Sequence, residues 1–325
     1  MNGYLGIDVG SVSTNIVLID EDGHVVETNY LRTRGQPIAT VQTGLQELKR
    51  SLSSDIKIMG VGTTGSGRRL AGLIVGADAI KNEITAHGVA ASALVPGVQT
   101  IIEIGGQDSK IIILRNGVVK DFAMNTVCAA GTGSFLDQQA ARLNIPIEKF
   151  GEYALQSKSP VRIAGRCAVF AESDMIHKQQ AGCSLPDILA GLCEALVRNY
   201  LNNLGKGKEI LPPVIFQGGV AANTGMVKAF ESALGMPVQV PPHFNVMGAV
   251  GAALLAKEAV KKNGRSKFKG FGIFEKSYRA GSFECSGCAN LCEVVEITEN
   301  DAILARWGDR CGKWNSLAAK EEKIS

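Results

Sequence analysis

Residues 6–14 read Gly-Ile-Asp-Val-Gly-Ser-Val-Ser-Thr, and residues 101–106 read Ile-Ile-Glu-Ile-Gly-Gly. In each stretch an apolar, β-branched run ends in glycine, and a second apolar run follows soon after. Each stretch therefore predicts a strand, a tight glycine turn and a returning strand, with both strands covered on two faces. Asp8 and Glu103 hold equivalent places at an offset of about 95 residues, so each predicted hairpin has a carboxylate just before its turn.

The predicted turns carry groups suited to the phosphates of a nucleotide and to its magnesium ion. Glycine lets backbone N–H groups approach phosphate oxygens closely. The hydroxyls of Ser11, Ser13 and Thr14 can donate hydrogen bonds to the same oxygens. Because Mg²⁺ gives up water reluctantly, Asp8 and Glu103 can hold it through its water shell.

A third strand-to-glycine signal, at 214–220, precedes a helix predicted over 223–234. Two ordinary β-hairpins with glycine turns are the simplest alternative, but the matched carboxylates and the third glycine turn disfavour it. No GxxxxGK(S/T) motif is present, which argues against a P-loop protein. No GxGxxG motif links the first strand to a helix, which argues against a Rossmann fold.

These stretches resemble four motifs of the sugar kinase, chaperone and actin superfamily. Residues 6–14 resemble its first phosphate motif, 102–108 its second, 216–223 its adenosine motif and 244–253 the helix that connects its lobes. The resemblance implies an α/β, two-lobed actin-like (ribonuclease H-like) ATPase fold whose lobes close around the phosphates. Glu103 departs from the pattern, since the second motif usually begins with Asp.

The length and composition of the chain fit two domains and a short appendage. Of its 325 residues, 45% are apolar and 20% are charged, as in soluble globular proteins. The 34 Lys and Arg nearly balance the 31 Asp and Glu, which gives no reason to expect nucleic-acid or membrane binding. No signal segment and no apolar run of about 18 residues is present, so we expect a cytoplasmic protein. The expected domains are lobe I at 1–95 with a returning helix at 246–264, lobe II at 96–245, and a cysteine-rich, metal-binding tail at 265–325.

Cys128 and Cys167 each stand just before a predicted helix, at about 134–143 and at 168–180. The partial positive charge of a helix N-terminus lowers the pKa of a thiol and favours an anionic metal cluster. Taken alone, either cysteine would more readily be assigned as a small buried residue. A shared role for Cys128 and Cys167 as metal ligands therefore has to be supported by the residues around them.

The surroundings of the two cysteines, 124–133 and 166–173, resemble one family: the activators of 2-hydroxyacyl-CoA dehydratases and the related ATPase subunits of benzoyl-CoA reductase. Residues 60–65 and 82–87 also fit, and the resemblance covers about residues 3–262. It implies a homodimer that holds one 4Fe–4S cluster with two thiolates from each subunit. A cubane takes four cysteine ligands, so two ligands per chain agree with a twofold axis.

The same resemblance implies an ATP-driven one-electron donor. A reduced ferredoxin or flavodoxin would load the cluster. The electron would pass to an iron–sulfur partner, which is a 2-hydroxyacyl-CoA dehydratase, a benzoyl-CoA reductase-like enzyme or a double-cubane-cluster protein. The expected catalytic residues are Asp8, Glu103, Gln107 and Asp108, of which Gln107 and Asp108 would position the attacking water. The residues expected to bind ATP or ADP are Gly10, Ser11, Ser13, Thr14, Gly105, Gly106, Gly131, Thr132, Gly133, Gly218, Gly219 and Asn223.

The tail contains four further cysteines, which begin as a CxxCxxxC motif: Cys285, Cys288, Cys292 and Cys311. A segment this short needs a staple in order to fold, and four cysteines can close a small metal site. Zn²⁺ and a second Fe–S cluster both fit the spacing. The tail resembles segments of longer activase-like proteins.

Two other classes of protein remain open. A small-molecule kinase, such as an N-acetylhexosamine kinase, would share the phosphate motifs but would have no use for Cys128 and Cys167. A metal-stapled regulatory or chaperone module would hydrolyse ATP without transferring electrons. Two residues receive structural assignments: Cys193 is predicted to lie in the core, and His87 to be a satisfied polar group.

Overall fold

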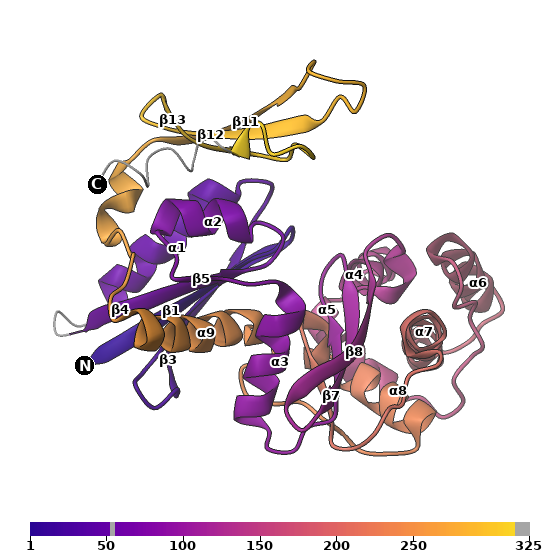
Figure 1. Cartoon of the computed structure of the whole chain (residues 1–325). Helices are drawn as coiled ribbons and strands as arrows, with labels where there is room; N and C mark the ends of the chain where they lie inside the picture. The colour runs from indigo at the N-terminus through magenta and orange to yellow at the C-terminus, as the bar shows by residue number, and fades with distance from the viewer. Residues whose placement is uncertain (53–55, 316–325) are drawn as a thin grey trace. The chain divides into compact units, whose positions relative to one another are not determined.

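The computed structural model describes residues 1–52 and 56–315. The chain forms two compact units, each with its own sheet (Figure 1). The first unit is Met1–Lys81 with Leu255–Ser325, and the second is Asn82–Leu254. Within the described residues, no helix is long and apolar enough to cross a membrane.

This division differs from the expected boundary between the lobes at residue 95. Helix α3 (Glu83–Leu94) belongs to the second unit because it packs on strands β7 (Ser109–Arg115) and β8 (Val118–Asn125). The tail belongs to the first unit and does not form a compact unit of its own.

The first unit is built on a five-stranded sheet with the order β3-β2-β1-β4-β5. Strands β1 (Asn2–Val9) and β2 (Ser13–Ile19) are antiparallel, as predicted around the first glycine turn, and β4 runs parallel to β1. Their apolar side chains pack with helices α1 and α2 into one core. The remaining bounds are β3 (Val25–Arg32), α1 (Pro37–Ser51), β4 (Lys57–Thr64), α2 (Arg68–Val75) and β5 (Ala79–Ile80).

The second unit repeats this plan in a sheet with the order β10-β9-β6-β7-β8. Strands β6 (Thr100–Ile104) and β7 are antiparallel, and β9 (Val214–Gln217) runs parallel to β6. Each sheet thus holds a glycine-turn hairpin beside a parallel strand, which confirms the predicted internal repeat. The other elements are the turn η1 (Ala129–Gly131), α4 (Gly133–Arg142), α5 (Ile147–Ala154), α6 (Ala168–Gln180), α7 (Leu185–Tyr200), the π-helical turn η2 (Leu201–Gly205), η3 (Gly219–Ala222), α8 (Thr224–Leu234), β10 (Val238–Gln239) and α9 (Met247–Asn263), whose residues fall in both units.

Helix α7 supplies much of the core of the second unit, because most of its residues are buried. It begins after Ser184, whose hydroxyl accepts a hydrogen bond from the N–H of Asp187. The carboxylate of Asp187 accepts hydrogen bonds from the hydroxyls of Ser157 and Ser184, both at 2.6 Å. The bonds from the Ser157 and Ser184 hydroxyls hold the pKa of the Asp187 carboxyl below its usual value. The loop that leads toward α6 is therefore fastened to the first turn of α7.

The same loop stays against α7 as far as its last turn. The N–H of Val161 donates to the carbonyl of Asp187 at 3.1 Å. The guanidinium of Arg198 donates to the carbonyl of Ile163 at 2.7 Å. At Gly191, an added Cβ would stand 2.1 Å from the carbonyl oxygen of Val161, so only glycine lets the loop approach this closely.

The tail forms an antiparallel sheet of β11 (Tyr278–Glu284), β12 (Glu293–Glu299) and β13 (Ala302–Trp307), preceded by the turn η4 (Phe271–Glu275). It is fastened to α1, since Nε2 of Gln42 donates to the carbonyls of Ile273 and Lys276, both at 3.0 Å. Ile273 and Tyr278 are buried in the core of the first unit. The tail therefore completes that core.

We expect Gly191→Ala to destabilise the protein by about 1–3 kcal/mol, because the new methyl group would meet a backbone carbonyl rather than a movable side chain. Thermal or urea-induced unfolding measures the change. Gly272→Ala is the matched control, since a Cβ at that residue meets nothing within 4 Å. Equal stability of the two variants would contradict the close packing between α7 and the loop.

Candidate functional site

The first glycine turn joins β1 to β2 and is closed by backbone and hydroxyl contacts. The N–H of Gly10 donates to the carbonyl of Ser13 at 2.9 Å. The hydroxyl of Thr33 donates to the carbonyl of Gly10 at 2.9 Å and lies 3.0 Å from the hydroxyl of Thr14. Thr14 is fully buried, whereas Ser11 of the same turn is exposed. Of the hydroxyls predicted to bind phosphate, that of Ser11 belongs to an exposed residue, and that of Thr14 is buried against Thr33.

Asp8 lies at the end of β1, between polar residues of both neighbouring strands. It is paired in register with Asn15 of β2 and with Thr64 of β4. Gly65 has a φ of +90°, and a Cβ there would lie 2.5 Å from Oδ1 of Asp8. Within the described residues, Oδ1 of Asn15 and Oγ1 of Thr64 are buried without a hydrogen-bond partner. Such orphaned oxygens beside a carboxylate suit a bound ligand or ion.

The second glycine turn brings together three segments that the sequence predicted separately. The N–H of Gly105 donates to the carbonyl of Asp108 at 3.0 Å and closes the turn. The N–H of Gly133, at the start of α4, donates to the carbonyl of Gly105 at 2.9 Å. Gly218 has a φ of +87°, and a Cβ there would lie 2.7 Å from Oε1 of Glu103. The second phosphate motif, the start of α4 and the adenosine motif therefore converge on Glu103.

The ammonium group of Lys110 is the main functional feature that the sequence prediction missed. Its Nζ lies 2.8 Å from Oε2 of Glu83, 3.0 Å from Oε2 of Glu103 and 2.8 Å from Oδ2 of Asp108. Lys110 and Glu103 are both buried. Hairpin register gave a signal for this contact, since a turn at 105–108 places Lys110 directly opposite Glu103.

One ammonium cannot neutralise three carboxylates, and the pKa values reflect this imbalance. Burial disfavours the ionised form of Glu103 and, despite the attraction of Lys110, raises its pKa to about 8. Burial alone would lower the pKa of Lys110, but Glu103, Glu83 and Asp108 together raise it, so the lysine stays charged. The group keeps an excess of negative charge that a divalent cation would offset.

His87 of α3 is a neutral, satisfied polar group, as predicted. Its Nδ1 lies 2.7 Å from Nε2 of Gln217, and both side chains are buried. Burial, helped by the nearby charge of Lys110, lowers the pKa of His87 to about 3. A proton-transfer role for His87 near neutral pH is therefore not supported. The prediction for Cys193 also holds, since burial raises the pKa of this core thiol to about 12.

A pocket of about 710 Å³ adjoins the predicted adenosine motif in the second unit. Most of its lining is apolar, with Lys228 and Glu231 as its charged members. Asn223 caps α8 beside it: Oδ1 accepts from the N–H of Met226, while Nδ2 has no partner within the described part of the chain. Its lining residues are Leu155, Ala221, Ala222, Thr224, Val227, Lys228, Glu231, Val238, Val240 and Phe244.

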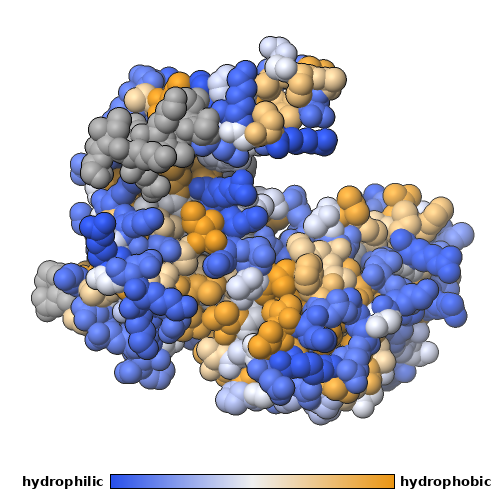
Figure 2. Space-filling model, in the orientation of Figure 1, coloured by the Kyte–Doolittle hydropathy of each residue, from blue (hydrophilic) through white to orange (hydrophobic). Residues whose placement is uncertain are grey.

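Cys167 is the N-cap residue of α6, as the sequence predicted. Cys128 instead caps the short 3-10 turn η1, and Thr132 is the N-cap of the predicted helix, α4. Both thiols are partly exposed. Large apolar side chains beside them point to solvent: Val127 is 96% exposed, Val169 69% and Phe170 66%. Figure 2 shows apolar residues at the surface where α4 and α6 lie. Two partly exposed thiols within an apolar surface suit ligands of a group that is buried only when another protein covers it.

The four tail cysteines lie at one end of the tail sheet, because Cys285 follows β11, Cys292 precedes β12 and Cys311 follows β13. The N–H of Cys285 donates to the carbonyl of Cys292 at 2.8 Å. The indole of Trp314 lowers the pKa of the Cys285 thiol. Within residues 1–52 and 56–315, however, no three cysteine sulfurs lie within 4.8 Å of one another. The tail metal site therefore stays a prediction.

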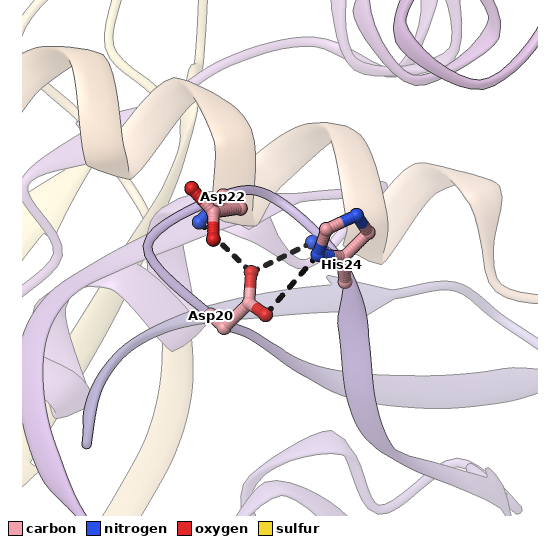
Figure 3. A group of neighbouring side chains, drawn as sticks. All are labelled: Asp20, Asp22 and His24. Carbon is pink, nitrogen blue, oxygen red and sulfur yellow. Dashed lines mark hydrogen bonds and ion pairs between the residues drawn. The ribbon is translucent and has the colours of Figure 1, made fainter.

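Asp20, Asp22 and His24 form another group of possible metal ligands, in the turn between β2 and β3 (Figure 3). Oδ1 of Asp20 accepts from the backbone N–H groups of Asp22, Gly23 and His24 at 2.8–2.9 Å. Asp22 and His24 are exposed. These contacts explain the cluster as the closure of a hairpin turn.

Replacing Lys110 with Met should leave three carboxylates without their shared ammonium and destabilise the protein by about 3–5 kcal/mol. Glu103→Gln is the matched variant, because it keeps the shape and replaces a side chain whose pKa is raised to about 8, so that little charge is lost at neutral pH. We expect its effect on the free energy of unfolding at neutral pH to be much smaller. Urea-induced unfolding without added metal measures both.

The contribution of Glu103 to folding stability depends on pH, and the direction of this dependence follows from its pKa. The pKa of Glu103 is raised from 4.5 to about 8, so the folded state binds this proton more tightly than the unfolded state. The stability that the proton contributes is present below pH 4.5 and is lost as the pH rises through about 8. Glu103→Gln should flatten this part of the stability profile, and parallel profiles for the two proteins would contradict the raised pKa.

Comparisons with known proteins identify relatives of this chain. The (R)-2-hydroxyglutaryl-CoA dehydratase activating ATPase of Acidaminococcus fermentans is 35% identical to this chain over 267 residues, covering 79% of the chain and 98% of that protein. The activator of lactoyl-CoA dehydratase from Anaerotignum propionicum is 34% identical, with the same two coverages. The structure of the activator of the 2-hydroxyisocaproyl-CoA dehydratase from Clostridium difficile with bound ADPNP has a TM-score of 0.73 and 30% identity, covering 81% of this chain and 97% of that one.

The family described as the BadF/BadG/BcrA/BcrD ATPase family matches residues 5–256 of the chain. The match includes both phosphate turns, the adenosine motif, Cys128 and Cys167, and it ends before the tail sheet. The fold, the converging glycine turns and the relatives lead to one assignment. The chain has an α/β actin-like ATPase fold and belongs to the BadF/BadG/BcrA/BcrD ATPase family.

Proposed function

We propose that this protein is an ATP-dependent one-electron donor that works as a homodimer and activates a partner iron–sulfur enzyme. One observation carries the proposal: the segment that holds Cys128 is hydrogen-bonded to the second phosphate turn. The N–H of Gly133 donates to the carbonyl of Gly105, and the N–H of Ser134 donates to that of Gly106, both at 2.9 Å. The hydroxyl of Ser134 donates to the same carbonyl of Gly106.

These bonds give nucleotide binding a short path to a metal-ligating cysteine. Any movement of the Gly105–Gly106 turn is transmitted to the start of α4 and hence to η1, which Cys128 caps. ATP can bias such a movement only if it binds two arrangements of the protein with different affinities. The proposal thus assigns the coupling to differential binding at the turn.

Cys128 and Cys167 fit a 4Fe–4S cluster that is shared between two copies of the chain. Both thiols are partly exposed, Cys167 at the N-terminus of α6 and Cys128 at the start of the turn η1. Each chain offers two such thiols and a cubane takes four, so the homodimer supplies the full set. When bound, the cluster would provide one-electron chemistry. The exposed side chains of Val127, Val169 and Phe170 would be covered by the second copy.

For the nucleotide, we propose that the turns at 10–14 and 105–108 bind the phosphates of Mg-ATP. Asp8 and Glu103 hold Mg²⁺ through water, and the excess negative charge around Lys110 supports a cation there. Gln107 is exposed at the tip of the second turn, which suits a role in orienting the attacking water. The apolar pocket beside Asn223 suits the flat base of the nucleotide.

The names of the relatives support a partner enzyme. They are activators of CoA dehydratases, and a component of the benzoyl-CoA reductase of Thauera aromatica is also related, at 29% identity. We propose that a reduced ferredoxin or flavodoxin in the cytoplasm supplies the electron. The acceptor is a dehydratase, a benzoyl-CoA reductase-like enzyme or a double-cubane-cluster protein. A small-molecule kinase would have no use for Cys128 and Cys167.

Asp8→Ala should lower Mg-ATP hydrolysis by roughly a hundredfold or more while leaving the iron content unchanged, because Asp8 serves the phosphates and the metal ion. ATPase assays and iron analysis on anaerobically purified protein measure both. Asp20→Ala is the control, since this carboxylate closes an exposed turn in the same unit. Hydrolysis at the wild-type rate in Asp8→Ala would remove the phosphate-turn assignment.

Cys167→Ser should abolish the visible absorbance of the shared cluster rather than halve it, because two of four thiolates would be lost from each dimer. The expected loss is about four iron atoms per dimer, and Cys128→Ser should lose the same amount. Cys183→Ser is the control, since Cys183 is also a partly exposed thiol but does not cap α6. Full iron content in Cys167→Ser would refute the electron-donor proposal.

A further inference from the structure

Two buried asparagine side chains, Asn125 and Asn199, meet beside Gly131 in the second unit. A Cβ at Gly131 would lie 2.8 Å from Oδ1 of Asn199 and 3.1 Å from Nδ2 of Asn125. Asn125 is the last residue of β8, and Asn199 lies in the last turn of α7. They are 8% and 4% exposed. Two elements that are distant in the sequence thus direct an amide to the same point.

Asn125 fixes the backbone of Cys128 from both sides. Its Oδ1 accepts from the N–H of Cys128 at 2.9 Å, and its Nδ2 donates to the carbonyl of Cys128 at 2.8 Å. Across the sheet, Asn125 is paired with Ser109, the residue that follows Asp108 of the second phosphate turn. The Cys128 loop is therefore tied to the same hairpin that carries the phosphate turn.

Asn199 holds the loop that leads to Cys167. Its Nδ2 donates to the carbonyl of Gly165 at 2.6 Å, two residues before that cysteine. Gly165 lies tightly against α7, since a Cβ there would stand 2.7 Å from the carbonyl oxygen of Ala195. The neighbouring N–H of Ala164 donates to Oδ2 of Asp174 in α6 at 2.8 Å. The Gly165 carbonyl is thus a fixed link between α7 and the loop that begins α6.

We propose that Asn199 is a positioning residue that holds the Cys128 and Cys167 loops at one spacing, so that the Cys167 loop follows nucleotide binding at the second phosphate turn. This inference rests on the proposed function, because it takes both cysteines as ligands of one group. The Cys128 segment is already bonded to the phosphate turn through Gly133 and Gly105. Asn199 gives the Cys167 loop the corresponding connection.

The coupling depends on the close approach at Gly131. This glycine lies between Cys128 and Gly133, which is hydrogen-bonded to Gly105 of the second glycine turn, and even a Cβ has no room between Gly131 and the Asn199 amide. A displacement of Gly131 toward α7 therefore pushes on Asn199, and the bond to Gly165 passes the movement to the Cys167 loop. Gly131, predicted to bind the nucleotide, thus has a second reason to be glycine.

The test is the alkylation of Cys128 and Cys167 by iodoacetamide in the cluster-free, full-length protein, with and without Mg²⁺ and ADPNP. Mass spectrometry of the peptides gives a rate for each thiol separately. In the wild type, we expect the nucleotide to change both rates. In Asn199→Ala, Cys128 should keep its response and Cys167 should lose it. The rate at Cys167 without nucleotide should rise roughly two- to tenfold, because one buried hydrogen bond no longer holds the loop.

Asn203→Ala is the matched control. Nδ2 of Asn203 donates to Oδ1 of Asn199 at 3.1 Å from an exposed position, so its loss leaves the bond from Asn199 to Gly165 in place. Both thiols should respond to the nucleotide in this variant as in the wild type. Loss of the Cys167 response in Asn203→Ala as well would show a general loosening of α7 and overturn the proposal.

Gly131→Ala is a second variant that displaces Asn199 from the opposite side, and it decides the question if Asn199→Ala does not fold. It should also uncouple Cys167 from the nucleotide, while Cys128 keeps its response and so shows that the nucleotide still binds. A nucleotide response at Cys167 that persists in the folded variants would overturn the role of Asn199 and leave the proposed function intact. A wild type in which the nucleotide alters neither thiol would count against the proposed coupling function itself, and the inference would fall with it.

Discussion

The buried ammonium of Lys110 is the interaction on which the site of the second unit depends. It draws Glu83 of α3, Glu103 of β6 and Asp108 of the glycine turn to one point. The backbone of Lys110 is also fixed, because the hydroxyl of Tyr200 in α7 donates to its carbonyl at 2.6 Å. A single residue therefore connects a helix, the hairpin and the core helix α7. The carboxyl groups outnumber the one ammonium, and the lysine forms an ion pair with each of them.

Helix α7 gives this arrangement a rigid support. Its buried face lies in the core, and its edge holds the loop that leads to Cys167 from Asp187 to Asn199. The second glycine turn is hydrogen-bonded to the start of α4 through the backbone of Gly133. The second glycine turn and the cysteine segments thus share short connections, through the backbone at Gly133 and through the side chain of Asn199 at Gly165. Such connections suit the transmission of small movements, because packed backbone has little freedom to absorb them.

The sequence predicted the parts that depend on local pattern. Glycine-ended β-branched runs located the two hairpins, and Cys167 was placed correctly at the start of α6. Cys128 was expected before α4 but caps the short turn η1, which has no helical periodicity for the sequence to reveal. The sequence did not predict contacts that depend on tertiary approach, such as the ion pair between Glu83 and Lys110. Nor did it place α3 in the second unit, because the apolar residues of this helix are spread around its circumference and do not reveal which sheet it covers. The length of the turn alone sets the hairpin register, so the sequence could have predicted that Lys110 lies directly across from Glu103.

The anchoring of the tail sheet has a consequence for how this protein can be shortened. The family match ends at residue 256, which suggests a natural place to cut the chain. Yet Ile273 and Tyr278 belong to the core of the first unit, and Gln42 satisfies two carbonyls of the segment between them. A fragment that ends at residue 256 would expose apolar surface on α1, and such a surface promotes self-association. Relatives without the tail need a polar face at the same place, so the difference in length should be accompanied by a difference in the surface chemistry of that helix.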